Sequence, residues 1–458
     1  MAEVWRFFAH EDDFADLDAE ALCRRLGDEL AIPTVDGPTA DTTDWAAFDQ
    51  LEAYFRECFP RLFAAAEVEK VDHSLMLHVP GANASLRPAL LLGHMDVVPV
   101  VPGTEGDWTH GAFSGHVDET YVWGRGALDM SDQVMGMLEA VEYVLAHDGL
   151  PPRPLIICLG QDEETLQSGA RRMGQLLLER GVRAEYAIDE GDYLVSDLSS
   201  FGGTAGRGLL VFLAEKGYAD FKLTVRSAGG HSSNPFGGTS LAVLSQAITR
   251  LTEAEWGCEV TPLLAQTLAA VGAPVPADPH ELLGNRELFP YVTTTCAPTM
   301  ICGGSAQANV MPQDMTATVN FRLLSGTTVA AVEARVRELL ADLPVEVALV
   351  DEVSNDPSHV SVAEGAGWRA LLAAAGRCFA DPATGEPLPV VPALLLGASD
   401  SRMYECVCDT CLRFSPFVAD ADEVARGVHG TDERITKRAY LQGIRFFIHL
   451  IREDAVLG

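Results

Sequence analysis

Basic residues are scarce in this chain. Its 458 residues include 66 Asp and Glu but only 32 Lys and Arg, which gives a formal net charge of -34. A negative field of this size repels phosphate backbones and anionic lipid headgroups, so nucleic acid and membrane surfaces are excluded as partners. The acidic surplus itself is interpreted as a solvated surface that favours solubility.

Long apolar runs and a secretory leader are also missing. No stretch has the length of apolar sequence that a bilayer span needs. Residues 1–8 lack a basic flank and a long apolar core and pass directly into acidic sequence, which is not the pattern of a signal peptide. We therefore expect a cytoplasmic protein.

Regularly spaced cysteines are absent as well. The ten Cys residues show no disulfide-like spacing, so we expect mostly buried thiols in a reducing compartment. The densest group is Cys406, Cys408 and Cys411. A zinc site there would need a second pair of ligands at matching spacing, which the sequence does not offer, so we interpret these residues as structural thiols.

The chain does have the length and the apolar content for more than one core, with 48% hydrophobic residues. From residue 88 onward, apolar runs of strand length alternate with helical patterns, as at 89–92, 134–145 and 155–159. Such alternation predicts an α/β fold, with a mixed sheet covered by helices on both faces. Functional residues are then expected at the carboxyl ends of the strands.

Between residues 215 and 350 the pattern changes. Strand, helix, strand, strand, helix and strand patterns follow one another at 218–226, 241–251, 293–301, 314–324, 329–340 and 345–350. This βαββαβ order predicts an inserted ferredoxin-like lid domain. The Pro- and Gly-rich stretch 272–285 is interpreted as a lid loop. Residues 1–214 and 351–458 are predicted to form the two parts of the catalytic domain.

Short acidic clusters follow three of the predicted strands. They lie at 91–96, 124–129 and 161–164. A histidine, an aspartate and a glutamate on different segments are ligand types that hold zinc, and a spare glutamate can serve as general base. His94 and Asp96 point the same way in extended backbone, so the Asp96 carboxylate is expected to fix the tautomer of His94. Taken alone, such a pair is more often a satisfied buried histidine.

The turn before the next helix carries Asp129. Ser131 and Asp132 are both good N-cap types, so one of them is expected to start the helix and to leave Asp129 on the loop before it.

Seven short motifs follow one another along the chain. They are Gly93-His94-Met95-Asp96-Val97-Val98-Pro99, Arg125-Gly126-Ala127-Leu128-Asp129-Met130, Asp162-Glu163-Glu164, Asp189-Glu190-Gly191, Gly230-His231-Ser232, Asn309-Val310-Met311-Pro312 and His429-Gly430-Thr431-Asp432-Glu433. Their order resembles that of the aminoacylase-1 / carboxypeptidase family of dizinc metallopeptidases. That family includes carboxypeptidase S, carnosinases, glutamate carboxypeptidases and succinyl-diaminopimelate desuccinylase. The likeness runs from about residue 88 to the C-terminus, and it implies a zinc-exopeptidase-like catalytic domain with an inserted lid.

The resemblance implies two zinc ions per subunit, for which manganese or cobalt can substitute. Asp129 would bridge them, with His94 and Glu190 completing one site and Glu164 and His429 completing the other. It also implies a cis peptide bond after Asp129.

Further roles are implied by the same resemblance. Glu163 would be the general base, and Asp96 would support the site from behind the ligands. His231 would reach the active site of the partner subunit, which implies a homodimer through the lid. Two features leave room for difference: the loop 165–169 is one residue longer than the usual form, and Asp189 is an alternative to Glu190 as ligand.

Specificity is expected from Arg402. Its segment 397–402 resembles the Gly-Gly-Thr-Asp-Ser-Arg segment of carboxypeptidase S-like members, and a guanidinium there would grip a substrate carboxylate. Asn309 would add a hydrogen bond from the lid. We therefore predict hydrolysis of N-acyl amino acids or short peptides next to a free carboxylate. The alternatives are a carnosinase-type dipeptidase, which would need a free amine on its substrate, and a family member without catalysis, which would bind no metal.

Overall fold

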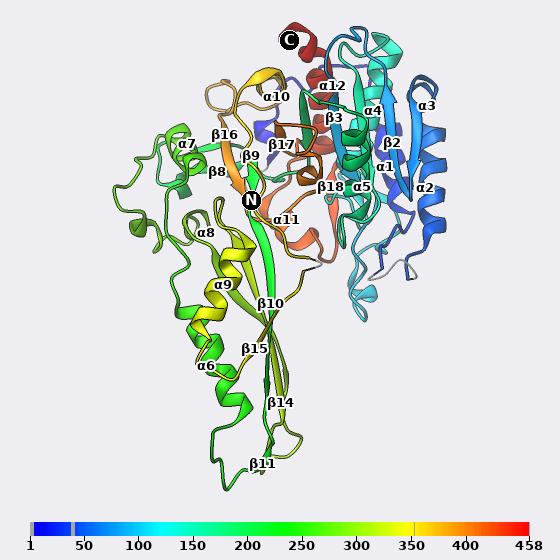
Figure 1. The fold of residues 1–458 in the computed structure, drawn as a ribbon. Helices are drawn as coiled ribbons and strands as arrows, with labels where there is room; N and C mark the ends of the chain where they lie inside the picture. Colours follow the sequence, from blue (N-terminus) through cyan, green and yellow to red (C-terminus); the bar gives the residue numbers. More distant parts are fainter. Residues whose placement is uncertain (1–3, 38–41, 352, 458) are drawn as a thin grey trace.

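The computed structural model describes residues 4–37, 42–351 and 353–457, and two main sheets organise them (Figure 1). A nine-stranded mixed sheet and its helices form the body, and a four-stranded antiparallel sheet forms a smaller lid. The predicted α/β class with an inserted second domain is thereby confirmed. Residues 1–3, the start of the segment expected not to be a signal peptide, lie outside the described residues. Across the described ranges, no helix combines the length and the apolar character that a bilayer span requires.

Parallel pairing joins the central strands of the body. Its strands are β1 (Glu67–Val71), β2 (Ser74–Val79), β3 (Ala89–His94), β6 (Leu155–Gly160), β7 (Tyr186–Asp189), β8 (Ser196–Asp197), β9 (Arg207–Glu215), β16 (Val390–Leu395) and β17 (Cys411–Arg413). The order is β1-β2-β6-β3-β7-β17-β9-β16, with β8 paired to β9. β3 runs parallel to both β6 and β7, so the carboxyl ends of these three strands lie at one edge of the sheet.

Strands β3 and β6 are apolar on both sides because both faces of the sheet are covered. Leu91 enters the core on one face, whereas Leu90 and Leu92 enter the core on the other. In β6, Ile157 enters the same core as Leu91, and Ile156 enters the same core as Leu90. The two-residue period of a strand thus sends a continuous apolar run into two separate cores.

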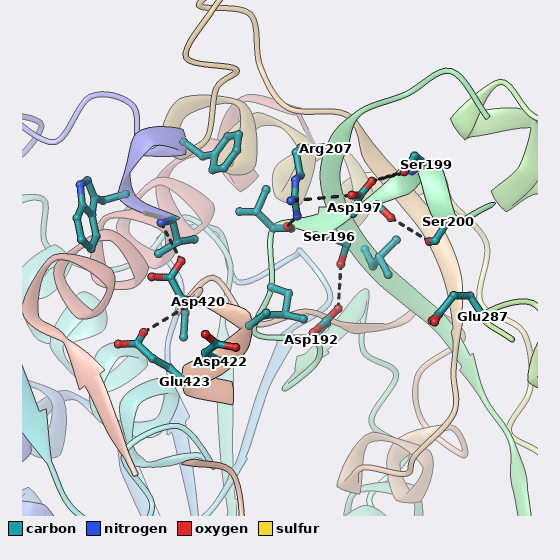
Figure 2. Close-up of a pocket in the computed structure, with 18 of the residues that line it drawn as sticks. Asp192, Ser196, Asp197, Ser199, Ser200, Arg207, Glu287, Asp420, Asp422 and Glu423 are labelled. Carbon is teal, nitrogen blue, oxygen red and sulfur yellow. Dashed lines mark hydrogen bonds and ion pairs between the residues drawn. The ribbon is translucent and has the colours of Figure 1, made fainter. Parts of the chain in front are cut away.

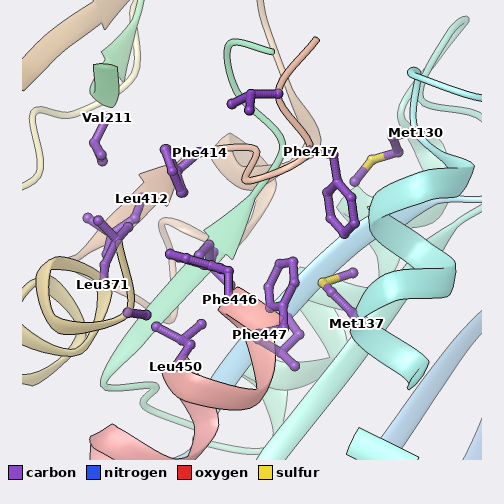
Figure 3. Packing of buried hydrophobic residues seen from close by; sticks show 14 of the residues in the cluster. Met130, Met137, Val211, Leu371, Leu412, Phe414, Phe417, Phe446, Phe447 and Leu450 are labelled. Carbon is purple, nitrogen blue, oxygen red and sulfur yellow. The ribbon is translucent and has the colours of Figure 1, made fainter. Parts of the chain in front are cut away.

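Helices pack on both faces of the body sheet. The larger core is covered by α1 (Ala19–Leu30), α2 (Trp45–Cys58), α3 (Pro60–Ala65), α4 (Ser131–His147), α10 (Gly365–Cys378) and α12 (Lys437–Leu457). Figure 3 shows its centre, where Phe414, Phe417, Phe446 and Phe447 gather beside Met137 of α4. The smaller core lies beneath α5 (Ser168–Glu179).

The lid has the predicted βαββαβ order. Its elements are β10 (Gly217–Arg226), α6 (Ser240–Glu253), β12 (Thr295–Gly303), β14 (Asp314–Leu323), α9 (Val329–Leu339) and β15 (Glu346–Leu349). The sheet order β12-β14-β10-β15 is that of the split ferredoxin-like arrangement. At the end of the lid that lies farthest from the body in Figure 1, β11 (Gly230–His231) pairs with β13 (Val310–Met311).

One stretch within the expected lid range 215–350 returns to the body. Helix α7 (Pro262–Val271) packs against β16, and its Leu264 belongs to the larger body core. Thr267 Oγ1 donates a hydrogen bond to the carbonyl of Pro392 at 2.7 Å. Apolar residues of 272–285 pack on the same core, so the expectation of a lid loop there is wrong. Composition indicated the irregular backbone but not the core that it joins.

Candidate metal centre

The carboxyl ends of three parallel strands bring predicted site residues together. β3 ends at His94, which is in register with Gly160 at the end of β6. Glu163 and Glu164 follow β6, and Glu190 follows β7. Because the three strands lie side by side and run in the same direction, these side chains meet at one edge of the sheet.

Asp129 reaches the same place from the turn before α4. Its Oδ1 lies 3.2 Å from Nε2 of His94, and its Oδ2 lies 3.0 Å from Nε2 of His429. The same histidine atoms lie 3.8 Å from Oε1 of Glu190 and 3.0 Å from Oε1 of Glu164, respectively. Two groups of three donors result, each with its atoms within 4.8 Å of one another, and they share Asp129. Each Asp129 oxygen serves one group, which is the arrangement of a bridging carboxylate.

The surroundings of His94 suit a metal ligand. Its Nδ1 lies 2.9 Å from the backbone carbonyl oxygen of Asp96 and can donate a hydrogen bond there. When the ring is neutral, Nε2 then keeps its lone pair and faces Asp129 and Glu190. Imidazole nitrogen and carboxylate oxygen are donors that zinc takes in proteins. The donors present therefore fit a pair of divalent cations.

The electrostatics of the site point the same way. Burial raises the pKa of Glu163 and of Glu190 well above the usual range, and neighbouring carboxylates add to the shift. Burial also opposes the charge on Asp129, but hydrogen bonds from His429 and His94 outweigh it and lower the pKa of that carboxyl. The hydrogen bond to Asp129 is the largest cause that raises the pKa of His429 to about 10. The neighbouring carboxylates favour a proton on each histidine, and divalent cations, which need neutral imidazoles, would take the place of those protons.

The carboxylate of Asp96 binds the backbone of Glu163 and Glu164 rather than the ring of His94. Its Oδ1 accepts the N–H of Glu163 and its Oδ2 accepts the N–H of Glu164, both at 3.0 Å. We expected this carboxylate to fix the His94 tautomer, but its Oδ1 lies 3.4 Å from Nδ1, and the backbone carbonyl is nearer. The side chain of Glu163 accepts a hydrogen bond at 2.8 Å from Gln167, which lies in the lengthened loop.

Glu433 is a supporting residue that sequence reasoning missed. It is fully buried, and its Oε1 accepts the N–H groups of Leu128 at 2.9 Å and of Asp129 at 3.2 Å. Its Oε2 accepts from Arg125 Nη1 at 2.5 Å and from the N–H of Gly126 at 3.0 Å. It therefore fixes the loop that presents Asp129. The signal was available, because Glu433 and Arg125 both lie in the motifs that carry the family resemblance.

Helix α4 begins in the expected place but with a different cap. Its first residue is Ser131, and its N-cap is Met130, which offers no side-chain hydrogen bond. The expectation of Ser131 or Asp132 as N-cap is wrong, because both lie inside the first turn and Ser131 Oγ donates to Glu29 instead, at 3.1 Å. The bond Asp129–Met130 is cis, as the resemblance implies.

Two predicted site residues lie on the lid, apart from both donor groups. His231 belongs to β11, is exposed, and has its Nδ1 2.8 Å from Ser233 Oγ. Asn309 precedes β13, and its backbone carbonyl accepts the N–H of Ser232 at 2.9 Å. Figure 1 separates this end of the lid from the carboxyl ends of the body strands. The roles of both side chains at the active site stay predictions.

Arg402 contacts the segment that returns from the lid. It lies on the short helix η5 (Asp400–Tyr404). Nη1 donates to Asn355 Oδ1 at 2.5 Å, and Nη2 donates to the backbone carbonyl of Asp356. Nη1 also lies 3.9 Å from Oε2 of Glu215. The side chain is 9% exposed, so it is not a loose surface arginine, and its grip on a substrate carboxylate stays a prediction.

The cysteine group is separate from this centre. Cys406, Cys408 and Cys411 are free thiols that pack with the smaller core, where Cys408 and Cys411 are buried. Within the described ranges, neither of the two donor groups that could hold a metal contains a cysteine.

Comparison with known proteins gives one family. The family model described as "Peptidase family M20/M25/M40" matches residues 90–453. The chain is 30% identical to the probable carboxypeptidase S-like 2 of Dictyostelium discoideum, over 97% of this chain and 87% of that protein. It is 31% identical to the N-fatty-acyl-amino acid synthase/hydrolase PM20D1 of Xenopus tropicalis, over 96% and 87%. It is 28% identical to carboxypeptidase S of Saccharomyces cerevisiae, over 93% and 83%.

Solved structures share the fold. Human carnosine dipeptidase 1 superposes with a TM-score of 0.69 at 17% identity, over 98% of each chain. The metallo-carboxypeptidase Sso-CP2 of Sulfolobus solfataricus also gives 0.69 at 17% identity, over 94% of this chain and 98% of that one.

Proposed function

This chain belongs to peptidase family M20/M25/M40 and is a metal-dependent hydrolase, and we propose that it cleaves the amide bond of N-acyl amino acids or short peptides beside a free carboxylate. The observation that carries the proposal is the pair of donor groups that share Asp129, with Glu163 next to them. The names of the relatives, carboxypeptidase S and an N-fatty-acyl-amino acid hydrolase, support this substrate class.

Two zinc ions are the proposed cofactors, with manganese or cobalt as substitutes. His94 and Glu190 would hold one ion, Glu164 and His429 the other, and Asp129 both. When bound, the ions supply a Lewis acid for the substrate carbonyl and acidify water.

The chain itself moves the protons. Glu163 takes a proton from the water that attacks the amide carbonyl and delivers it to the nitrogen of the leaving amine. Its support is geometric: Asp96 fixes its backbone, Gln167 orients its carboxylate, and the adjacent Glu164 belongs to a donor group. Adjacent residues at a strand end can thus serve proton transfer and metal binding separately.

Arg402 and Asn309 would bind the substrate, and the lid would form the contact with a second subunit. In the proposed homodimer, His231 of the partner subunit stabilises the negative charge on the substrate oxygen. This assignment is supported by the exposed position of that residue at the end of its own lid. The edge strand β12 supports a lid contact, because it exposes 60% of Met300 and 58% of Ile301.

One assay panel tests the proposal. Purified protein is analysed for metal and assayed with N-acyl amino acids and with dipeptides that carry a free amine. We expect hydrolysis of the N-acyl compounds, loss of activity with a chelator, and recovery on addition of zinc. Turnover only of substrates with a free amine would replace the proposal with a dipeptidase. A protein that neither binds metal nor turns over any substrate would be a binding member of the family.

A further inference from the structure

A cavity of about 1270 Å³ is lined by parts of the segment 192–201, helix α11 (Ala421–Gly427) and other segments (Figure 2). Among the described residues that line it, none is a predicted metal ligand, Glu163 or Arg402. Several of its carboxylates hold its own walls: Asp197 caps the short helix η3 (Leu198–Phe201), and Asp420 and Glu423 form the capping box of α11. Reactive groups without a role in the metal centre lie elsewhere, in the cysteine group.

Cys408 and Cys411 have Cys-x-x-Cys spacing. This spacing lets one thiol attack the other across a tight turn and form a disulfide. Both residues are free thiols and are buried, whereas Asp409 between them is exposed. The pair therefore lies just beneath the surface, in the connection between η5 and β17.

The two thiols differ in acidity because they contact each other. A hydrogen bond between them lowers the pKa of the Cys408 thiol and raises the pKa of the Cys411 thiol. Burial instead raises the pKa of Cys158 to about 12, which is the usual effect on a thiol in apolar surroundings. Since the thiolate is the nucleophile, Cys408 is the thiol that attacks first, and Cys411 keeps its proton until the second step.

His359 adds to the reactivity of Cys408. Its positive charge favours the thiolate, and its Nε2 lies 3.1 Å from the backbone carbonyl oxygen of Asp409. Its Nδ1 lies 3.2 Å from Oε2 of Glu405, and the hydrogen bond with Glu405 raises the pKa of His359. A cation beside a Cys-x-x-Cys pair is a setting in which thiols become reactive.

The pair is connected to Arg402 through one residue. Cys411 Sγ donates to the carbonyl of Ser401 at 3.8 Å, and Ser401 directly precedes Arg402 on η5. Ser401 Oγ donates at 3.2 Å to Glu215, the carboxylate beside the guanidinium of Arg402. A disulfide carries no S–H, so it would remove the hydrogen bond to Ser401. It would also close a loop of only a few residues, which gives little entropic stabilisation and leaves the bond easy to reduce.

We propose that Cys408 and Cys411 are a redox-sensitive pair: hydrogen peroxide joins them in a reversible disulfide, which displaces Ser401 and weakens the grip of Arg402 on a substrate carboxylate. The disulfide itself does not depend on the proposed function. Its effect on Arg402 rests on that function and deepens it, because it adds regulation to the same site.

The oxidation takes two steps. The Cys408 thiolate attacks one oxygen of the peroxide, the O–O bond breaks, and a sulfenic acid and hydroxide result. The sulfur of Cys411 then attacks the sulfur of Cys408, the S–S bond forms, and the S–O bond breaks, so that the hydroxyl group leaves with the Cys411 proton as water. The hydroxide from the first step takes up the proton that Cys408 released. Two thiols and one peroxide thus give one disulfide and two waters, and a small dithiol reverses the oxidation.

Peptide mapping tests the disulfide without any assay of activity. The reduced protein is treated with hydrogen peroxide, unfolded, alkylated at its remaining thiols and cleaved with trypsin, which releases residues 403–413 as one peptide. We expect this peptide to lack two hydrogen atoms, to carry an alkyl group on Cys406 alone, and to be alkylated at all its cysteines after dithiothreitol. A link to Cys406, or sulfinic or sulfonic acid at Cys408 in place of the disulfide, would overturn the pair. Intact thiols in this peptide at peroxide doses that oxidise the exposed Cys302 would do the same.

Cys408→Ser and Cys406→Ser are a matched pair of variants. Cys408 Sγ donates to the carbonyl of Thr410 at 3.2 Å, a contact that a serine hydroxyl can also make. Cys408→Ser should form no disulfide in this peptide, whereas Cys406→Ser should form the same disulfide as the wild type. Equal disulfide formation in both variants would contradict the assignment. The map of the wild-type protein decides the linkage even if Cys408→Ser fails to fold.

Kinetics test the link to Arg402. Zinc-loaded enzyme is assayed with an N-acyl amino acid and with its matching amide before oxidation, after oxidation, and after reduction, desalting and addition of fresh zinc. We expect kcat/KM for the acid to fall at least about fivefold on oxidation, the lower end of the usual coupling between two sites, and to recover on reduction. The amide should lose far less, and Cys408→Ser should not respond to peroxide.

The possible failures are distinguishable. A disulfide that leaves both substrates unaffected, or that lowers kcat/KM equally for both, would overturn the link to Arg402 and keep the disulfide. If no N-acyl amino acid is hydrolysed before oxidation, the proposed function fails, and the peptide map still decides the disulfide.

Discussion

The buried carboxylate of Glu433 accepts the backbone N–H of Asp129 at 3.2 Å, although 304 residues separate the two in sequence. Glu433 also pairs with Arg125 at 2.5 Å and belongs to neither donor group. It is therefore a positioning residue. It fixes the backbone from which Asp129 offers one oxygen to each group.

Glu433→Gln should weaken both the fold and metal binding. The amide leaves Arg125 buried without its carboxylate, which typically costs about 3–5 kcal/mol in the free energy of unfolding. Loss of a supporting partner should also weaken zinc affinity roughly 10–100-fold. Urea denaturation and competition with a chelator measure the two effects, with the exposed Glu119→Gln as control. Wild-type zinc affinity in Glu433→Gln would contradict the positioning role.

Glu163→Gln should abolish most turnover while the fold and both metals remain. Only proton transfer is removed, an effect commonly of order 10²–10⁴ in rate. Steady-state kinetics, metal analysis and circular dichroism on one preparation measure the three properties. Near-normal turnover with both metals bound would show that another group is the base.

His231 is predicted to act on the partner subunit, which mixed dimers can test. Two inactive proteins, His231→Ala and Glu163→Gln, should regain part of the activity when their subunits exchange, because one of the hybrid sites then has both groups. Exchange is followed independently with subunits of different mass. Exchange without recovered activity would place His231 outside the reaction of the partner subunit.

Arg402→Ala should harm substrates with a free carboxylate more than the matching amides. Truncation of one partner of a buried charge pair costs about 2–5 kcal/mol, here expected in kcat/KM for the acid. Asn355→Ala is the matched control, since it removes the side-chain contact between Arg402 and the returning segment but keeps the guanidinium and its hydrogen bond to the carbonyl of Asp356. If Arg402→Ala lowers kcat/KM equally for the acid and the amide, the role of Arg402 is to hold the returning segment and not to bind the substrate carboxylate.

Lys216 should make stability depend on pH. Burial lowers its pKa to about 7 from an ordinary value of 10.5, with repulsion from Arg322 as a second cause. Between these values the unfolded chain binds a proton that the folded chain lacks, so stability rises with pH and is lost as pH falls toward 7. Relative to Lys216→Met, the unfolding free energy should rise by about 1 kcal/mol per pH unit between about pH 8 and 10. If urea denaturation gives the two proteins the same pH dependence of the unfolding free energy across this range, the lowered pKa of Lys216 is contradicted.

Much of the fold could be predicted because burial leaves a local pattern. Strand β14 was expected at 314–324 and lies at Asp314–Leu323, since its side chains alternate between the lid core and the opposite face. The helical spacing expected at 329–340 corresponds to α9, whose Val332 and Val336 enter the same core. Helix α7 shows the limit. An apolar face can be read from a sequence, but which of two cores it joins depends on the tertiary path.

The candidate site divides in a similar way. His94 and Glu190 could be located because strand ends and motif order coincide there. Motif membership also marked Asp96 and Glu433, but their hydrogen-bond partners could not be predicted, because contacts with backbone N–H groups of distant segments have no signature in residue spacing. The tautomer of His94, for example, depends on a backbone carbonyl whose position is fixed only in the folded chain.

The segments that connect lid and body are hydrogen-bonded to one another. The chain crosses between body and lid before β10, after α6, before β12 and after β15, and these segments are counted here in that order as the first to the last crossing. Lys216 Nζ donates to the carbonyl of Thr293 at 2.8 Å, which ties the first crossing to the third. Tyr218 and Asn355 exchange backbone hydrogen bonds at 2.9 and 2.8 Å, which ties the first crossing to the last. The remaining crossing follows α6 and joins the third, through the N–H of Glu259 and the carbonyl of Val292 at 2.9 Å.

These hydrogen bonds couple the connecting segments, so we expect the lid to move against the body as one unit rather than segment by segment. The return of α7 to the body also means that the lid is not a contiguous module of sequence. A fragment of residues 215–350 would carry the apolar face of α7 into water and should aggregate, whereas a fragment that replaces 254–292 with a short linker should stay monodisperse.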